Sequence, residues 1–131
     1  MKVQRKGERA DALGFAKGVV LKHKNGTDAG KLPLDKNTMV RDVSVSGVAI
    51  TTDSLLGRGD VIQLSFYLPG TQAPIKLEGR AIRGMRYMDA MGGKYGYALH
   101  ITEISEEDKG RIQAYVAEME IVKLKQRGRK R

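Results

Sequence analysis

The chain has 131 residues, 40% of them hydrophobic and 30% charged, which fits one globular domain and excludes a disordered chain. It contains no cysteine, which excludes disulfides, thiolate nucleophiles and cysteine-ligated metals, and its two histidines, His23 and His100, are too few for a typical multi-histidine metal site. The net charge of +9 suits a polyanionic partner, but residues 32–122 carry −2, and the excess lies in residues 1–31 (+5) and 123–131 (+6).

Alternating apolar residues indicate a series of short strands along most of the chain. A weak strand is expected around Val19–Leu21, followed by a turn at Asn25-Gly26 and a loop that continues to Asp35. Each further strand should bury one face. The apolar positions of these strands are Val48 and Ile50; Ile62, Leu64, Phe66 and Leu68; Ile75, Leu77, Gly79 and Ala81; and Tyr95, Tyr97, Leu99 and Ile101.

The hydrophobic period changes from strand to helix near the C-terminus. Ser105 is an expected N-cap, because the acidic residues 106–108 follow it and favour the first turn of a helix. Residues 125–131 are expected to form a frayed end. The apolar stripe of the helix consists of Ile112, Tyr115, Val116 and Met119, with Val122 close to it. Short strands followed by one such helix predict an all-β barrel or sandwich capped by an amphipathic helix.

No arrangement of side chains indicates catalysis. His23 and His100 each lie in an expected strand, where they face solvent or one end of a barrel. Asp53, Asp60 and residues 106–108 fit turns and a helix cap, and the chain has no glycine-rich phosphate loop. We therefore expect a protein that is not an enzyme, with no catalytic and no metal-binding residues.

Two short motifs remain. The first is R-x-x-x-R at Arg5 and Arg9. About one pair of arginines with this spacing is expected by chance in a chain of this composition. The second is D-x-S-x-x-G at Asp42, Ser44 and Gly47, for which the chance expectation is roughly 0.04. The second motif has a purely structural interpretation, a turn in which the aspartate and serine bond their own backbone and Gly47 takes a positive φ. Both interpretations are open from the residues alone.

Together and in this order, the two motifs resemble those of the PilZ domain, the bacterial receptor module for cyclic di-GMP. The resemblance covers the chain from Arg5 to about Val122. It implies a six-stranded antiparallel barrel and a C-terminal helix, with a flexible arm at residues 1–15, the barrel and helix at residues 16–122, and a basic tail at residues 123–131. Three more segments are similar to the family, Leu56–Asp60, Gly79–Arg83 and Tyr95–Leu99.

The resemblance also implies a ligand site. Arg5 and Arg9 would grip guanine and phosphate, since a guanidinium can fork onto guanine, stack on it or pair with a phosphate. Asp42 and Ser44 would contact the base edge on the barrel surface, which Gly47 would shape. The resemblance implies that the ligand would be cyclic di-GMP, with no further cofactor, bound singly or as a stacked pair.

On this interpretation the arm becomes ordered over the ligand, and the signal passes to an unidentified downstream protein. The chain would be a monomer or homodimer. It has no export signal and no stretch of the ~18 apolar residues that span a membrane, so we expect a cytoplasmic protein without membrane insertion.

Two alternatives stay open. A small β-barrel that binds single-stranded nucleic acid would account for the positive charge. The chain has only two Phe, five Tyr and no Trp for base stacking, however, and its positive excess avoids the strands, so nucleic acid is disfavoured. The other alternative is a PilZ-type adaptor that does not bind the ligand.

Overall fold

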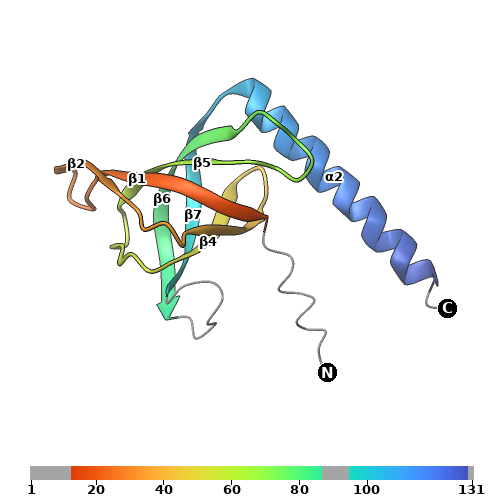
Figure 1. Ribbon diagram of the computed structural model, residues 1–131, viewed down its shortest axis with the longest axis horizontal. Coiled ribbons are helices and arrows are strands. Elements are labelled where there is room, and N and C mark those ends of the chain that lie inside the picture. The colour runs from red at the N-terminus through yellow and green to blue at the C-terminus, as the bar shows by residue number, and fades with distance from the viewer. Residues whose placement is uncertain (1–12, 87–94, 130–131) are drawn as a thin grey trace.

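The computed structural model describes residues 13–86 and 95–129. These residues form seven strands and one long helix (Figure 1). In chain order the elements are β1 (Gly14–Lys22), β2 (Asp28–Pro33), β3 (Met39–Val43), β4 (Gly47–Thr52), β5 (Val61–Phe66), β6 (Ile75–Arg86), β7 (Tyr95–Ile104) and α2 (Glu106–Arg129).

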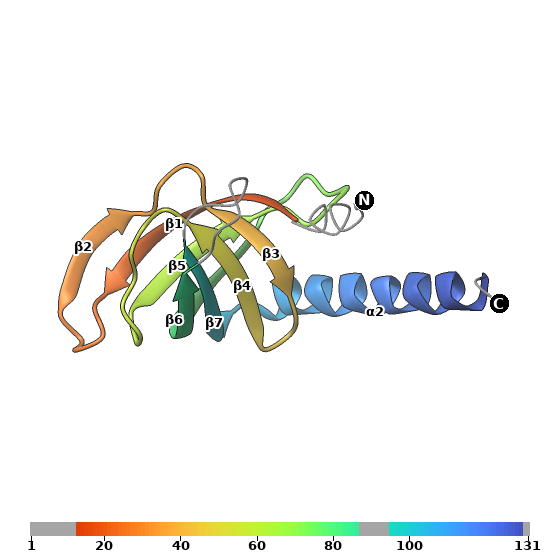
Figure 2. The same ribbon diagram turned by 90° about the horizontal axis from the view of Figure 1, so that it is seen from below.

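Six of the strands close into a ring. The order is β1-β3-β4-β7-β6-β5, and β1 then pairs with β5, so the sheet has no free edge within this ring. Every pairing is antiparallel. β1 pairs with two strands along the same edge. Its first residues pair with β3 and its later residues pair with β2. The ring and the C-terminal helix confirm the predicted barrel (Figure 2).

The segment after Asn25-Gly26 differs from the prediction. We expected a loop as far as Asp35, but residues 28–33 form β2, so that prediction was wrong. β2 pairs with β1 alone, outside the ring, and most of its side chains are exposed. A strand with no face in the core needs no alternation of apolar and polar residues, so β2 could not be predicted from hydrophobic periodicity.

The core follows the predicted alternation in β5 and β6. Every second side chain points inward and is buried, while the residues between them face outward. These inward residues meet others from β3, β4 and β7 in one continuous cluster. From β5 and the residues just beyond it they are Ile62, Leu64, Phe66 and Leu68, and from β6 they are Ile75, Leu77, Gly79 and Ala81.

The helix α2 is fastened to the barrel by its first turns. Ser105 is the N-cap, as predicted, because its Oγ accepts a hydrogen bond of 3.1 Å from the Asp108 N–H. Arg111 donates to the Ala73 carbonyl at 2.6 Å and forms an ion pair of 3.2 Å with Asp108. Ile112 is fully buried. The long remainder of α2 projects beyond the barrel (Figure 2).

The end of α2 also differs from the prediction. Residues 125–131 were expected to be frayed, but the helix continues to Arg129. Lysine, glutamine and arginine have high helix propensity, and cations are favoured at a helix C-terminus, which accounts for the extension. Within the described ranges no helix is both long enough and apolar enough to cross a membrane.

Candidate ligand-binding face

The predicted site residues fall in two groups. Arg5 and Arg9 lie outside the described residues. Asp42, Ser44 and Gly47 lie within them, at the end of β3, in the connecting turn and at the start of β4. The chain enters the barrel beside this motif, because the Leu13 N–H donates to the Val40 carbonyl at 2.8 Å. The first described residue is therefore next to β3, two positions before the aspartate of the motif.

A bulge in β3 turns two consecutive side chains toward the outer face of the barrel. The register between β3 and β4 shifts between Val40 and Asp42, which pair with Ile50 and Ala49. In a regular strand consecutive side chains point to opposite faces, and a bulge breaks this rule. The Arg41 side chain consequently lies over Thr51, which is buried, and its Nε–H donates to the Thr51 Oγ1 at 3.1 Å.

A second bulge lies in β6, on the other side of the β4–β7 pair. The register between β6 and β7 shifts between Ala81 and Arg83, which places Arg83 opposite Ala98. Ala81 and its partner Leu99 face the core, whereas Arg83 is exposed. Two irregular strands thus direct one arginine each toward the surface of β4 and β7.

Between these arginines lies a shallow depression of about 230 Å³. Arg41 and Arg83 stand on its two sides. Its floor is built from small side chains, chiefly Ala49, Gly84, Gly96 and Ala98. A floor of alanine and glycine leaves the backbone accessible to a flat ligand, and two guanidinium groups favour an anionic one. Sequence reasoning missed both arginines, because only the bulges bring them to this face.

The turn of the D-x-S-x-x-G motif is held by its own side chains. The Asp42 Oδ1 accepts a hydrogen bond of 2.9 Å from the next backbone N–H. The Ser44 Oγ accepts bonds from the N–H groups of Ser46 at 3.3 Å and Gly47 at 3.2 Å. The hydrogen bonds of the structural interpretation are therefore present. Both side chains are also exposed at the surface, which leaves acceptor capacity for a ligand.

Gly47 has a different role from the one that the structural interpretation gave it. It is absent from the glycines with positive φ, so that part of the interpretation was wrong. A Cβ added to Gly47 would lie 3.0 Å from the Leu99 carbonyl oxygen in β7. The glycine is needed because β4 and β7 approach closely here, and the Ile101 N–H also bonds the Ser46 carbonyl at 2.9 Å.

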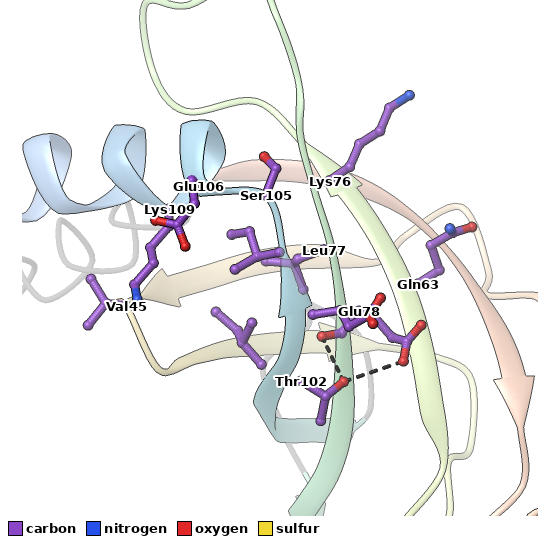
Figure 3. A pocket seen from close by; sticks show the side chains of 12 residues that line it. Val45, Gln63, Lys76, Leu77, Glu78, Thr102, Ser105, Glu106 and Lys109 are labelled. Carbon is purple, nitrogen blue, oxygen red and sulfur yellow. Dashed lines mark hydrogen bonds between the residues drawn. The ribbon is translucent and has the colours of Figure 1, made fainter.

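A larger open groove of about 740 Å³ lies on the other side of the turn. Figure 3 shows it between the first turn of α2 and strands β5 to β7, with Val45 at its margin. Its charged lining residues are two lysines and three glutamates, a balance that does not favour a dianion. They are Lys76, Lys109, Glu78, Glu103 and Glu106.

Buried polar groups fix the opposite end of β4. The Asp35 Oδ1 accepts hydrogen bonds from the Thr52 hydroxyl at 2.6 Å and the Asp53 N–H at 2.8 Å, and its Oδ2 accepts one from the Asn37 N–H at 2.9 Å. Burial raises the pKa of Asp35, but these bonds and one from Ser54 outweigh it, so its pKa lies below the usual 3.8. This carboxylate ties the loop before β3 to the end of β4.

Tyr97 makes a similar link from β7. Its hydroxyl oxygen accepts a hydrogen bond of 2.8 Å from the buried Leu56 N–H. Burial is the main reason that the pKa of Tyr97 is raised above the usual 10.0. The floor of the depression is therefore backed by a rigid connection to the loop after β4.

The closed barrel and the capping helix define the class of small β-barrel domains with a C-terminal helix. A model of the PilZ domain matches residues 4–118, and the chain belongs to the PilZ domain family. The comparison with curated proteins gives no match.

A solved structure with a similar fold is that of the Bacillus subtilis inhibitor of motility (MotI/DgrA). The TM-score is 0.63 with 16% sequence identity, and the match covers 86% of this chain. It spans 49% of the MotI/DgrA chain, about half of its length.

Proposed function

We propose that this chain is a receptor for cyclic di-GMP, which binds on the outer face of β3, β4 and β7 and is gripped by the N-terminal arginines. The observation that carries the proposal is the depression between Arg41 and Arg83, whose floor includes Ala49, the residue that pairs with the motif aspartate Asp42. The ligand presents two guanines and two phosphodiesters. Both kinds of group suit guanidinium partners.

Each residue of the proposed site has a distinct role. Asp42 accepts hydrogen bonds from the N1–H and N2–H₂ groups of a guanine, and the Ser44 hydroxyl bonds a base or phosphate oxygen. Arg5 and Arg9 close over the ligand from the arm. Ordering of the arm uses part of the binding free energy and creates a new surface for a downstream protein, so the chain acts without catalysis.

Isothermal titration calorimetry of the full chain with cyclic di-GMP tests this function. The wild-type chain should bind with low-micromolar or higher affinity. Arg5→Ala and Asp42→Ala should each weaken binding by about 5- to 150-fold, the range that corresponds to 1–3 kcal/mol for a guanine contact. Absence of binding heat in the wild type, or unchanged affinity in both variants, would contradict the proposal.

Arg83→Ala tests the barrel face separately from the arm. Because Arg83 is exposed, its loss should leave the melting temperature nearly unchanged while it lowers the affinity for cyclic di-GMP about tenfold. Lys17→Ala is the matched control, since Lys17 is an exposed cation on β1, away from the depression. If both variants lose affinity equally, the effect comes from net charge and the assignment of the face is wrong.

A further inference from the structure

The helix α2 has two apolar sides, and the barrel covers only one of them. Ile112, Tyr115 and Val116 face the barrel and are buried or half-buried. On the opposite side, apolar residues recur at alternating intervals of four and three, the period of a helix that packs along another helix. This outer stripe consists of Gly110, Ala114, Ala117, Ile121 and Leu124, all of them exposed.

The distal part of the outer stripe carries large exposed side chains. Ile121 is 54% exposed and Leu124 is 59% exposed. Among the described residues, the contacts of α2 with the barrel come from its N-terminal half, where Asp108, Arg111 and Ile112 lie and where Tyr115 and Val116 pack against the core, and the C-terminal part of the helix extends away from the barrel (Figure 2). Within the part of the chain that the structure describes, the stripe is therefore exposed to another helix.

The charges along α2 are divided by sign. Residues 106–120 include five acidic and two basic side chains, whereas residues 121–129 include four basic and no acidic ones. Two such helices in parallel would bring their basic ends together. In the antiparallel arrangement Glu118 and Glu120 of each helix lie beside the basic end of the other. The two helix dipoles also point in opposite directions, which is favourable.

We propose that a second copy of this chain docks antiparallel along the outer stripe of α2. When Ile121 packs against Leu124 of the second copy, the helical spacing places Glu118 beside Lys125 of the second copy, and the two-fold symmetry repeats both contacts. Ala117 is small enough to let the two backbones approach. The barrels then stand at opposite ends of the helix pair, with their ligand faces free.

The association depends on no ligand, so it can be tested apart from the receptor function. Sedimentation velocity of the full chain without cyclic di-GMP, over a wide range of concentration, should show a monomer–dimer equilibrium. Leu124→Glu should abolish the dimer. Val122→Glu is the matched control, because Val122 is 40% exposed on the other side of the helix, and it should keep the dimer. A monomeric wild type, or equal effects of the two variants, would overturn the proposal.

Charge reversal tests the orientation. Glu118→Lys should weaken the dimer by like-charge repulsion, and the addition of Lys125→Glu in the same chain should restore it, because both partners are then reversed. In a parallel pair these two positions do not meet, so no restoration would occur.

Cross-linking gives an independent readout, since the chain has no cysteine of its own. A mixture of Ile121→Cys and Leu124→Cys chains should form the mixed disulfide under mild oxidation. Preferential formation of the Ile121→Cys homodimer would show a parallel pair and refute the antiparallel one.

Discussion

Removal of the Asp35 carboxylate should lower the stability of the barrel. The carboxylate accepts hydrogen bonds from Thr52 and Asp53 at the end of β4 and from Asn37 in the loop before β3. It therefore links these two segments. Asp35→Asn keeps the size of the side chain but removes the charge, and its amide N–H₂ would face one of these donors. A net hydrogen bond to a charged group contributes about 1.5–3 kcal/mol, so we expect a loss of about 2–4 kcal/mol.

For a domain of this size, such a loss corresponds to a fall of about 10 °C in the melting temperature at pH 7. The pH dependence gives a second signature. Because the pKa of Asp35 is lowered in the folded chain, the unfolded chain takes up a proton at higher pH than the folded one. The stabilisation is complete above the usual value of 3.8 and is lost as the pH falls through the lowered pKa.

Thermal melts followed by circular dichroism at pH 7 and at about pH 3 measure both effects. The difference between wild type and Asp35→Asn should be large at pH 7 and smaller in acid. Asp28→Asn is a suitable control, because Asp28 is exposed and its carboxylate accepts a local hydrogen bond of 2.9 Å from the Gly30 N–H. A deficit that stays constant with pH, or that Asp28→Asn shares, would refute the role assigned to the charge.

Two further substitutions test the geometry around the ligand-binding face. Tyr97→Phe leaves the buried Leu56 N–H without its acceptor and should lower the free energy of unfolding by about 1–3 kcal/mol. Chemical denaturation measures this loss, and the m-value should stay equal to that of the wild type. Gly47→Ala places a Cβ 3.0 Å from the Leu99 carbonyl oxygen and should lower the melting temperature. Gly110→Ala, whose Cβ meets nothing within 4 Å in a helix, should raise it by an amount corresponding to about 1 kcal/mol. Equal shifts of the same sign in the two glycine variants would contradict the close approach of β4 and β7.

The parts of the fold that were predictable are those where burial imposes a period on the sequence. Ile62, Leu64 and Phe66 alternate because one face of β5 lies in the core, and the helical spacing of Ile112, Tyr115 and Val116 has the same reason. The predicted stripe continued to Met119 and Val122, but both are exposed. β2 was missed because it has no core face to impose a period. The helical end of α2 was not predicted, because its described side chains pack against no core and a run of basic side chains fits a helix end as well as a tail.

The site shows a similar division. The chemical spacing of Asp42, Ser44 and Gly47 marked a real turn on the barrel surface, but the backbone conformation of Gly47 could not be read from its residue type alone. Arg41 and Arg83 reach the depression through register shifts in β3 and β6. A bulge depends on how two strands pair, and the local sequence around either arginine does not predict one.

The irregular shape of β2 has a consequence for the behaviour of the folded chain at high concentration. β2 ends the strand order, and its outer edge has no strand partner among the residues described. Gly30 and Lys31 both have positive φ, which interrupts the regular row of backbone donors and acceptors, and Pro33 lacks an N–H altogether. A second sheet therefore finds no continuous ladder to extend, so this edge resists the growth of β-aggregates.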